Sequence, residues 1–404
     1  MKTLISLLNR PASWLFLTCC LVFSPSVVND FVWLDESEIL DGGYRIESIG
    51  DLKAVFGQPL DTYAFRKSGE ANARGGYYRP IYALSISFDW WLWGSNPLPY
   101  HVQNVLLHCL LVISLYYLGL ELCSSQEERA LVFVASLLFA TTPLSMQSVA
   151  WISGRKDTLC ALWSACSLLL LCRYSRHEAR KARTAAHFIA CVICFCLALG
   201  CKEQAVVVPG VGAYLVLIKT IQNRTNDSEG TKPGWGLAIL FGTLVLVLGG
   251  YLFLRSAVIG SLTFSSGEQA SVFEVLTGAF RLFSHYVYIS FFPFQSVLSD
   301  RWDPPPGLGF KEVVATSFVL AIGVATARRK SQWQLSVFGF FWSVVWLLPV
   351  LGFIPLRHEV AERYLYPAVW GWHLCWCIIL NTVLREFMAH SIVTSRGERF
   401  LLPE

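Results

Sequence analysis

The acidic pair Asp35-Glu36 is the strongest candidate for chemistry in this sequence. The pair follows the first apolar stretch, residues 11–28, and the aromatic residues Phe31 and Trp33. Aromatic side chains of this kind are enriched at the surface of a lipid bilayer. A carboxylate is costly to hold there, and it is well suited to accept a proton from a hydroxyl group. The position indicates acid–base chemistry at a membrane face, and the structural alternative is a solvated acid or a helix N-cap.

Basic side chains at the ends of apolar runs form a second set of candidates, because arginine and lysine bind the phosphate of a lipid. Arg79 is framed by aromatic residues in the sequence Tyr77-Tyr78-Arg79-Pro80, and Lys202-Glu203 joins two apolar runs with almost no loop. The structural alternatives are an interface anchor at Arg79, a helix cap near Arg155 and a salt-bridged hinge near Arg363. The predicted phosphate-binding residues are Arg79, Arg155, Lys202 and Arg363, and the predicted supporting residues are His108, Glu203, Glu362 and Tyr366.

The composition indicates that a membrane positions these residues. The chain has 404 residues, of which 54% are hydrophobic and 15% are charged, and its mean hydropathy is +0.49. Apolar runs of about 16 to 23 residues alternate with short polar breaks, which is the pattern of repeated bilayer crossing. The net charge of +4 is small. The sequence shows no basic stripe interleaved with aromatic residues, so no nucleic-acid partner is expected.

Ten apolar runs are predicted to cross the bilayer, so the expected fold class is an all-α polytopic membrane protein. The segment 278–296 is also apolar, but it contains Arg281, His285 and Pro293. We expect this segment to lie in the plane of the membrane, and the alternative is an eleventh crossing. The predicted crossings lie near residues 11–28, 101–122, 130–148, 157–172, 186–201, 203–221, 235–254, 310–327, 333–352 and 364–384.

The order of these runs predicts the organisation of the chain. Basic clusters such as Arg328-Arg329-Lys330 are expected on the cytoplasmic face, which places the first polar loop on the opposite face. Overlapping glycosylation sequons at residues 223–228 fall on the cytoplasmic side of this map, and glycans there would invert it. The predicted parts are a first span (1–28), a lumenal loop with the candidate acids (29–99), a multi-span domain (100–384) and a short tail without tetratricopeptide-type repeats (385–404).

The cysteines do not predict a disulfide framework or a metal site. All thirteen lie within apolar stretches or at their ends. Cys191, Cys194 and Cys196 are close in sequence, but they belong to a run of lipid length, where buried thiols are expected. No metal and no cofactor is therefore expected.

Six sequence features, taken in order, resemble the membrane domain of the TMTC family of transmembrane O-mannosyltransferases. The family is part of the GT-C glycosyltransferases and is related to the protein O-mannosyltransferases. The resemblance implies a GT-C-like bundle of about ten to eleven transmembrane helices with a large lumenal first loop. The features are Phe31-Val32-Trp33 with Asp35-Glu36, then Tyr77-Tyr78-Arg79-Pro80, His108, Ala150 to Asp157, Cys201-Lys202-Glu203 and Ala361 to Pro367.

The resemblance also implies a reaction. The donor would be dolichyl-phosphate-mannose, a substrate, and the acceptor would be a Ser or Thr hydroxyl of a secretory-pathway protein. The site would face the lumen of the endoplasmic reticulum, and a bacterial-type inner membrane is the alternative location. Asp35 would be the base with Glu36 supporting it, and transfer would invert the anomeric centre. Cations such as Arg79, Lys202 and Arg363 would neutralise the leaving phosphate.

Two departures from the family pattern keep other functions open. The family usually has Asp-Asp after the aromatic residues, where this chain has Leu34-Asp35. The family usually has His-Pro-x-His-x-Glu, where this chain has residues Thr142 to Gln147. The leading hypothesis is a mannosyltransferase, and the alternatives are a catalytically weakened GT-C scaffold and a transporter or lipid flippase. The sequence lacks the repeated halves that are typical of transporters.

Overall fold

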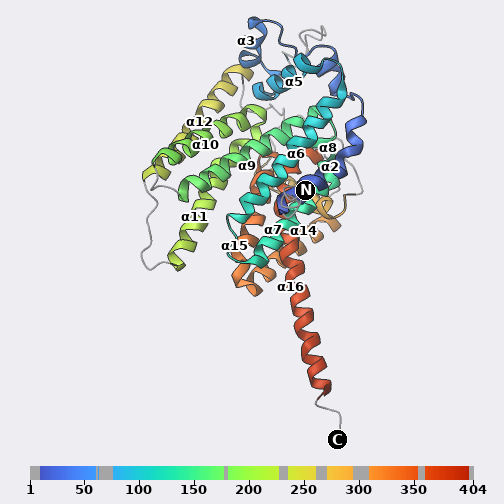
Figure 1. Ribbon diagram of the computed structural model, residues 1–404, viewed down its shortest axis with the longest axis vertical. Helices are drawn as coiled ribbons and strands as arrows, with labels where there is room; N and C mark the ends of the chain where they lie inside the picture. The colour runs from blue at the N-terminus through green and yellow to red at the C-terminus, as the bar shows by residue number, and fades with distance from the viewer. Residues whose placement is uncertain are drawn as a thin grey trace, which may run out of the picture.

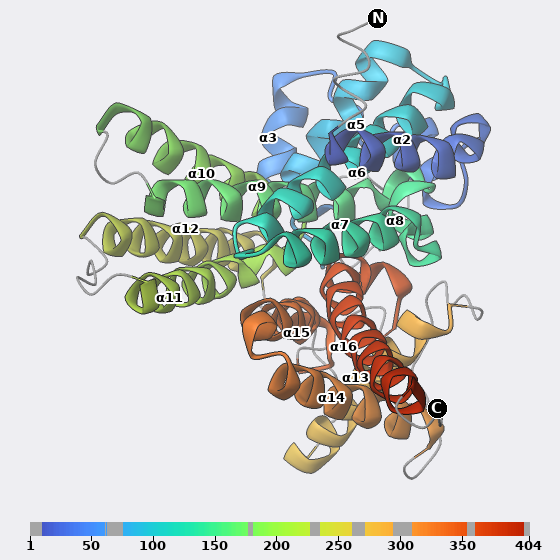
Figure 2. The same cartoon turned by 60° about the horizontal axis from the view of Figure 1, so that its bottom comes forward.

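Helices are the only regular elements in the part of the chain that the structure describes. This computed structural model describes residues 10–60, 62, 76–176, 181–226, 235–260, 271–293, 309–353 and 360–399. Figures 1 and 2 show α10, α11 and α12 grouped on one side of the bundle, and α13 to α16 gathered on another. The longer helices are α2 (Pro11–Phe23), α6 (Pro97–Leu120), α7 (Gln126–Thr141), α9 (Arg155–Arg176), α10 (Lys181–Cys201), α11 (Val208–Asn226), α12 (Trp235–Ile259), α13 (Val272–Phe291), α14 (Phe310–Arg328), α15 (Trp333–Leu347) and α16 (Tyr366–Arg399).

The predicted crossings are confirmed as helices of membrane length and composition. In the described part of the chain, nine helices are long and apolar enough to cross a bilayer. A tenth span results if α7 and the following segment Pro143–Val149, which are bent by 57°, count as one. Exposed apolar side chains such as Leu21 and Leu246 cover the outer surfaces of these helices, as contact with lipid tails requires. The chain is a multi-pass membrane protein.

Local sequence explains where several of these helices begin and bend. Asn96 caps α6 by accepting a hydrogen bond from the Leu98 amide. Ser125 and Glu128 form a reciprocal capping box at the start of α7. Pro143 follows the end of α7, because proline lacks the amide hydrogen that would continue the helix.

α13 covers most of the segment that we expect to lie in the plane of the membrane. This helix is not among those that are long and apolar enough to cross. Its side chains Val272, Phe273 and Leu276 are exposed, whereas His285 on the same helix is buried. The in-plane position remains a prediction, and residues 294–296 of the predicted segment lie outside the described residues.

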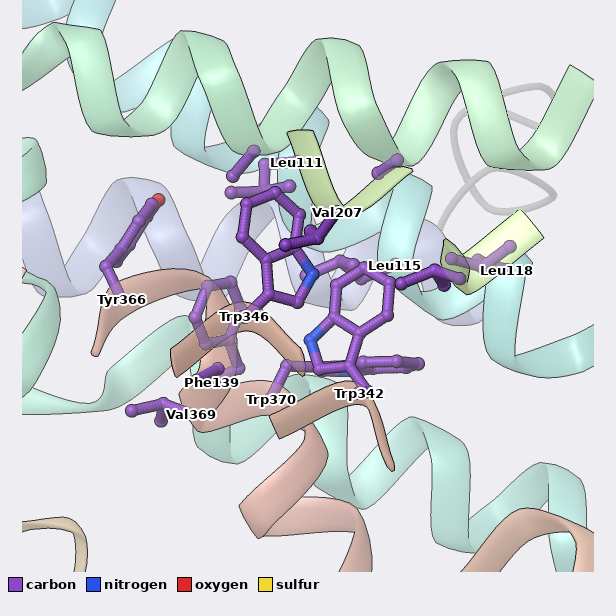
Figure 3. Packing of buried hydrophobic residues seen from close by; sticks show 14 of the residues in the cluster. Leu111, Leu115, Leu118, Phe139, Val207, Trp342, Trp346, Tyr366, Val369 and Trp370 are labelled. Carbon is purple, nitrogen blue, oxygen red and sulfur yellow. The ribbon is translucent and has the colours of Figure 1, made fainter. Parts of the chain in front are cut away.

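A cluster of large aromatic side chains joins α15 and α16 to the rest of the bundle. Figure 3 shows Trp342, Trp346 and Trp370 packed among Leu111, Leu115 and Leu118 of α6, Phe139 of α7 and Val207. The indole of Trp342 donates a 2.7 Å hydrogen bond to the Pro367 carbonyl. A Cβ atom at Gly371 would lie 2.4 Å from the Gly339 carbonyl oxygen, so glycine is what lets α15 and α16 approach. This packing fixes the first turns of α16 against α15.

The predicted tail is largely a continuation of α16. This helix runs to Arg399, so residues 385–399 are helical. Figure 1 shows the last turns of α16 extending beyond the rest of the bundle.

Candidate active site

Four short helical turns, far apart in sequence, carry or adjoin most of the candidate residues. The turns are η2 (Glu36–Leu40), η4 (Ile152–Gly154), η5 (Glu203–Val207) and η8 (Glu362–Tyr364). Three of them, η4, η5 and η8, lead into the membrane-length helices α9, α11 and α16, and η2 lies in the polar loop after α2. The hydrogen bonds and ion pairs described below link these turns directly or through neighbouring side chains.

Asp35 is fully buried and held by three hydrogen bonds. Its Oδ1 accepts from the Ser153 hydroxyl at 2.5 Å and from the Ser153 amide at 2.9 Å. Its Oδ2 accepts from the Val32 amide at 3.2 Å. Burial raises the pKa of Asp35 to about 6, although these hydrogen bonds lower it. A carboxylate with this pKa is ionised at neutral pH and basic enough to accept a proton.

The structure corrects the second predicted acid, because Glu36 is exposed and Glu38 is buried. Residues three apart lie on the same face of a helical turn, so Glu38 rather than Glu36 faces the same way as Asp35. Glu38 is 8% exposed, and its Oε2 accepts a 2.7 Å hydrogen bond from the Tyr82 hydroxyl. The charge of Glu38 adds to the rise in the pKa of Asp35. The nearby carboxylate is thus Glu38.

The predicted phosphate-binding role of Arg155 is contradicted by its surroundings. Its guanidinium is fully buried and forms an ion pair with Asp89. The Nε atom donates to Asn104 Oδ1 at 2.6 Å, and Nη2 donates to the Tyr100 carbonyl at 3.1 Å. Each of the three guanidinium nitrogens thus has a polar partner within the protein. Arg155 therefore ties the start of α9 to α6 and to α5 (Pro80–Trp93).

Two of the remaining predicted cations, Arg79 and Lys202, each form an ion pair. Arg79 donates to both carboxylate oxygens of Glu203, from Nε at 3.1 Å and from Nη2 at 2.6 Å. Burial alone would lower the pKa of Arg79, but the Glu203 carboxylate raises it, so the guanidinium stays charged. Lys202 pairs with Asp157. The structure thus gives Arg79 and Lys202 the acidic partners Glu203 and Asp157. These four residues form a charged constellation.

Tyr364 brings the segment before α16 into this constellation. The Lys202 amine lies 4.9 Å from the centre of the Tyr364 ring, and the Arg363 guanidinium carbon lies 5.5 Å from it. Glu362 is buried and lines the pocket described below. The neighbouring sequence Arg357-His358-Glu359 lies outside the described residues.

His108 and Tyr366 form a link in the core. His108 Nδ1 and the Tyr366 hydroxyl oxygen are 2.7 Å apart, and both side chains are fully buried. The His108 ring also packs against Phe23 and Phe139, with ring centres 5.1 Å and 5.5 Å apart. Figure 3 places Tyr366 beside the tryptophan cluster. The pair holds the start of α16 against α6.

A pocket of about 280 Å³ lies near Asp35, although Asp35 itself is not among its lining residues. Val32, whose amide binds Asp35, lines it, and so do Trp33 and Trp151. The two tryptophan rings meet edge to face with centres 5.7 Å apart. The rest of the lining comes from Asn29, Pro143, Leu144, Met146, Gln147, Ala150, Pro293 and Glu362.

Sequence reasoning missed several residues of this site. The spacing of three residues from Asp35 is a signal that would have selected Glu38. Tyr82 and Asp89 had no comparable signal, because only the packing of α5 brings them to the site. Within the described residues, no three His, Cys, Asp or Glu side chains are placed to hold a metal ion. The missed residues are Glu38, Tyr82, Asp89 and Asn104, whereas Ser153, Lys156 and Asp157 belong to the motif Ala150 to Asp157 that the sequence analysis singled out.

Comparison with curated proteins finds similar chains. No protein-family model matches the sequence. The chain is 27% identical to Protein O-mannosyl-transferase TMTC4 of Mus musculus over 273 residues, which cover 60% of this chain and 36% of that protein. It is 40% identical to Protein O-mannosyl-transferase TMTC1 of Homo sapiens over 159 residues, which cover 38% of this chain and 16% of that protein. The aligned part is thus well under half of either relative.

Comparison with solved structures supports the predicted fold. The crystal structure of the Archaeoglobus fulgidus oligosaccharyltransferase aligns with a TM-score of 0.50 over 94% of this chain and 50% of that chain, at 12% sequence identity. At this identity the likeness concerns the fold alone. The resemblance seen in the sequence motifs is confirmed: the chain is similar to proteins named Protein O-mannosyl-transferase TMTC4 and TMTC1, and its fold is similar to that of the oligosaccharyltransferase.

Proposed function

We propose that this chain transfers mannose from dolichyl-phosphate-mannose to Ser or Thr hydroxyls of secretory-pathway proteins in the lumen of the endoplasmic reticulum. The observation that carries the proposal is the environment of Asp35. This carboxylate is buried and held by Ser153 and Val32, and Val32 lines a pocket at the end of membrane-spanning helices. The chain is similar to relatives named protein O-mannosyl-transferases.

In the proposed reaction, the acceptor hydroxyl oxygen bonds to the anomeric carbon of mannose. The bond from that carbon to the phosphate oxygen breaks, and the hydroxyl proton passes to the Asp35 carboxylate. Dolichyl phosphate leaves with the electron pair of the broken bond. The acceptor approaches the face opposite the phosphate, so the configuration inverts through an oxocarbenium-like transition state. One base suffices for this reaction, and the loss of Glu36 from the site does not prevent it.

The charged constellation gives this reaction a fixed electrostatic setting. Arg79, Lys202 and Arg363 place positive charge near the site, and charges already in position stabilise a leaving phosphate without reorganisation. Because Glu203 and Asp157 pair with Arg79 and Lys202 and offset much of their charge, we assign those two cations only a weak, indirect influence on the leaving group. The pairs also keep the η5 turn in place beside the start of α9.

Mannose transfer in microsomes tests the proposal. Radiolabelled dolichyl-phosphate-mannose is supplied to membranes that contain the wild type, Asp35→Asn or Asp30→Asn. Asp35→Asn is expected to lower transfer about a hundredfold or more, because general-base catalysis contributes on the order of 10²–10⁴. Asp30 is an exposed carboxylate five residues away, and its replacement by Asn is expected to leave transfer unchanged.

The outcomes separate the alternatives. Equal transfer by the wild type and Asp35→Asn removes Asp35 from the mechanism. No transfer by the wild type contradicts the proposed activity and favours a GT-C scaffold or a lipid transporter.

A further inference from the structure

Lys156 is a buried cation at the centre of the constellation. Its side chain is 6% exposed. The amine donates one hydrogen bond, at 2.5 Å, to the carbonyl of Ser153. A lysine ammonium carries three donor hydrogens, so two of them have no hydrogen-bond acceptor among the described residues. Burial of such donors is costly unless a partner arrives.

The absence of an acidic partner within the described residues distinguishes Lys156 from its neighbours. Arg79, Arg155 and Lys202 each form an ion pair with a carboxylate. No carboxylate of the described residues lies within ion-pair distance of Lys156, and Glu38 and Asp157 act on it only from further away. An uncompensated buried charge costs several kcal/mol in stability, on the order of the penalty for desolvating one ion. Such a cost is typical of groups that bind a ligand of opposite charge.

The surroundings of the amine define where an anion would bind. Ser153 contacts Asp35 through its hydroxyl and amide, and Lys156 through its carbonyl. The amine lies 5.2 Å from the centre of the Tyr82 ring and 4.9 Å from that of Trp151. Trp151 lines the pocket beside Asp35. Trp151 therefore links Lys156 to the pocket, and Ser153 links Lys156 to Asp35, the proposed base.

We propose that Lys156 binds the phosphate group of the substrate, with Ser153 separating it from Asp35. The two remaining N–H donors of the ammonium bind phosphate oxygens, and the charge of the ammonium compensates that of the phosphate. The identity of the phosphate as a lipid phosphate rests on the proposed function. During transfer the leaving phosphate gains negative charge, so the ammonium stabilises the transition state more than the bound donor. In this proposal Lys156 binds the phosphate that the sequence analysis assigned to Arg155.

Ligand-dependent thermal unfolding of the purified full chain in detergent tests the proposal without requiring mannose transfer. The probes are dolichyl phosphate, dolichol and inorganic phosphate. The wild type is expected to be stabilised more by dolichyl phosphate than by dolichol. Lys156→Met is expected to lose this difference, with affinity for dolichyl phosphate reduced about tenfold or more, as for a hydrogen bond to a charged group. Lys53→Met removes an exposed lysine on α3 (Ile49–Gly57), and its affinity should equal that of the wild type.

A second readout separates phosphate binding from a structural role. Without lipid, Lys156→Met should unfold at the same temperature as the wild type or higher, because it removes an uncompensated buried charge. Lower stability together with an unchanged preference for dolichyl phosphate overturns the proposal. If Lys156→Met does not fold, the same results are expected for Lys156→Gln, whose side-chain amide also has a donor for the Ser153 carbonyl.

The comparison of inorganic phosphate with dolichyl phosphate identifies the source of the phosphate. Equal protection by inorganic phosphate and dolichyl phosphate, lost in Lys156→Met, supports phosphate binding and assigns the site to a free phosphate. Protection by dolichyl phosphate alone supports the lipid. If the wild type transfers no mannose but still prefers dolichyl phosphate over dolichol through Lys156, the proposed function fails and the phosphate site stands.

Discussion

The hydroxyl of Ser153 donates a 2.5 Å hydrogen bond to the carboxylate of Asp35, which lies 118 residues earlier in the chain. The amide of the same residue donates to the same oxygen at 2.9 Å. Both donors favour the charged carboxylate, and burial opposes them. The balance leaves a base that is ionised at neutral pH and neutral in mild acid.

The rate of mannose transfer is expected to fall as the pH drops through about 6. The pKa of Asp35 is raised to about 6, so above this pH the carboxylate is charged and accepts a proton, and below it the carboxyl group is neutral and cannot. The rate should fall about tenfold per pH unit on the acid side, in proportion to the ionised fraction. Initial rates at saturating donor between about pH 5 and pH 8 measure this profile. A constant rate across this range contradicts the assignment of Asp35 as base.

Replacement of Ser153 by alanine is expected to shift the fall in transfer rate at acid pH to a higher pH. The Ser153 hydroxyl lowers the pKa of Asp35, so its loss lets burial raise the pKa further above 6. The rate at neutral pH should fall several-fold, because less of the base is ionised and its orientation is less restricted. The control is Ser167→Ala, which removes a buried hydroxyl on the same helix α9 that donates to the Cys191 carbonyl. An unshifted profile in Ser153→Ala would show that the hydrogen bond does not tune Asp35.

Replacement of Arg155 by methionine is expected to destabilise the protein rather than weaken donor binding specifically. It leaves the buried Asp89 carboxylate without its partner, and breaking a buried pair in this way costs about 3–5 kcal/mol. The double variant Arg155→Met with Asp89→Leu should recover much of this loss, because no buried charge remains. Thermal unfolding of the three proteins in detergent measures the effect. A stable Arg155→Met variant that has lost dolichyl phosphate binding would restore the role expected from the sequence.

The predicted topology places Lys53 and Arg328 on opposite sides of the membrane. Both side chains are exposed, one on α3 and one at the end of α14, so cysteine at either position should react with a maleimide. Sealed microsomes should exclude an impermeant maleimide from Lys53→Cys until they are permeabilised, whereas Arg328→Cys should react at once. The parent protein, whose own cysteines lie in or at the ends of apolar stretches, gives the background. Labelling of the two positions in the reverse order would invert the orientation.

The sequence alone determined the membrane-spanning architecture, because lipid imposes a length and an apolar composition on each crossing that can be read residue by residue. The same rule identified the polar breaks at Asp35, Arg79 and Lys202, since charged residues interrupt the apolar composition of such runs. α13 was recognised as different for the same reason, because it carries Arg281 and His285 within an apolar run. Neither result depends on how the helices pack.

The tertiary structure decided which charged side chains are available for chemistry. Sequence motifs could not distinguish Arg155 from Lys156, which are adjacent, yet packing gives Arg155 three polar partners and leaves Lys156 with the Ser153 carbonyl. The exposure of Glu36 and the burial of Glu38 follow from the path of one short turn against α5. These outcomes depend on groups brought together from distant parts of the chain. The availability of a charge is set by its partners in space, and sequence order does not specify those partners.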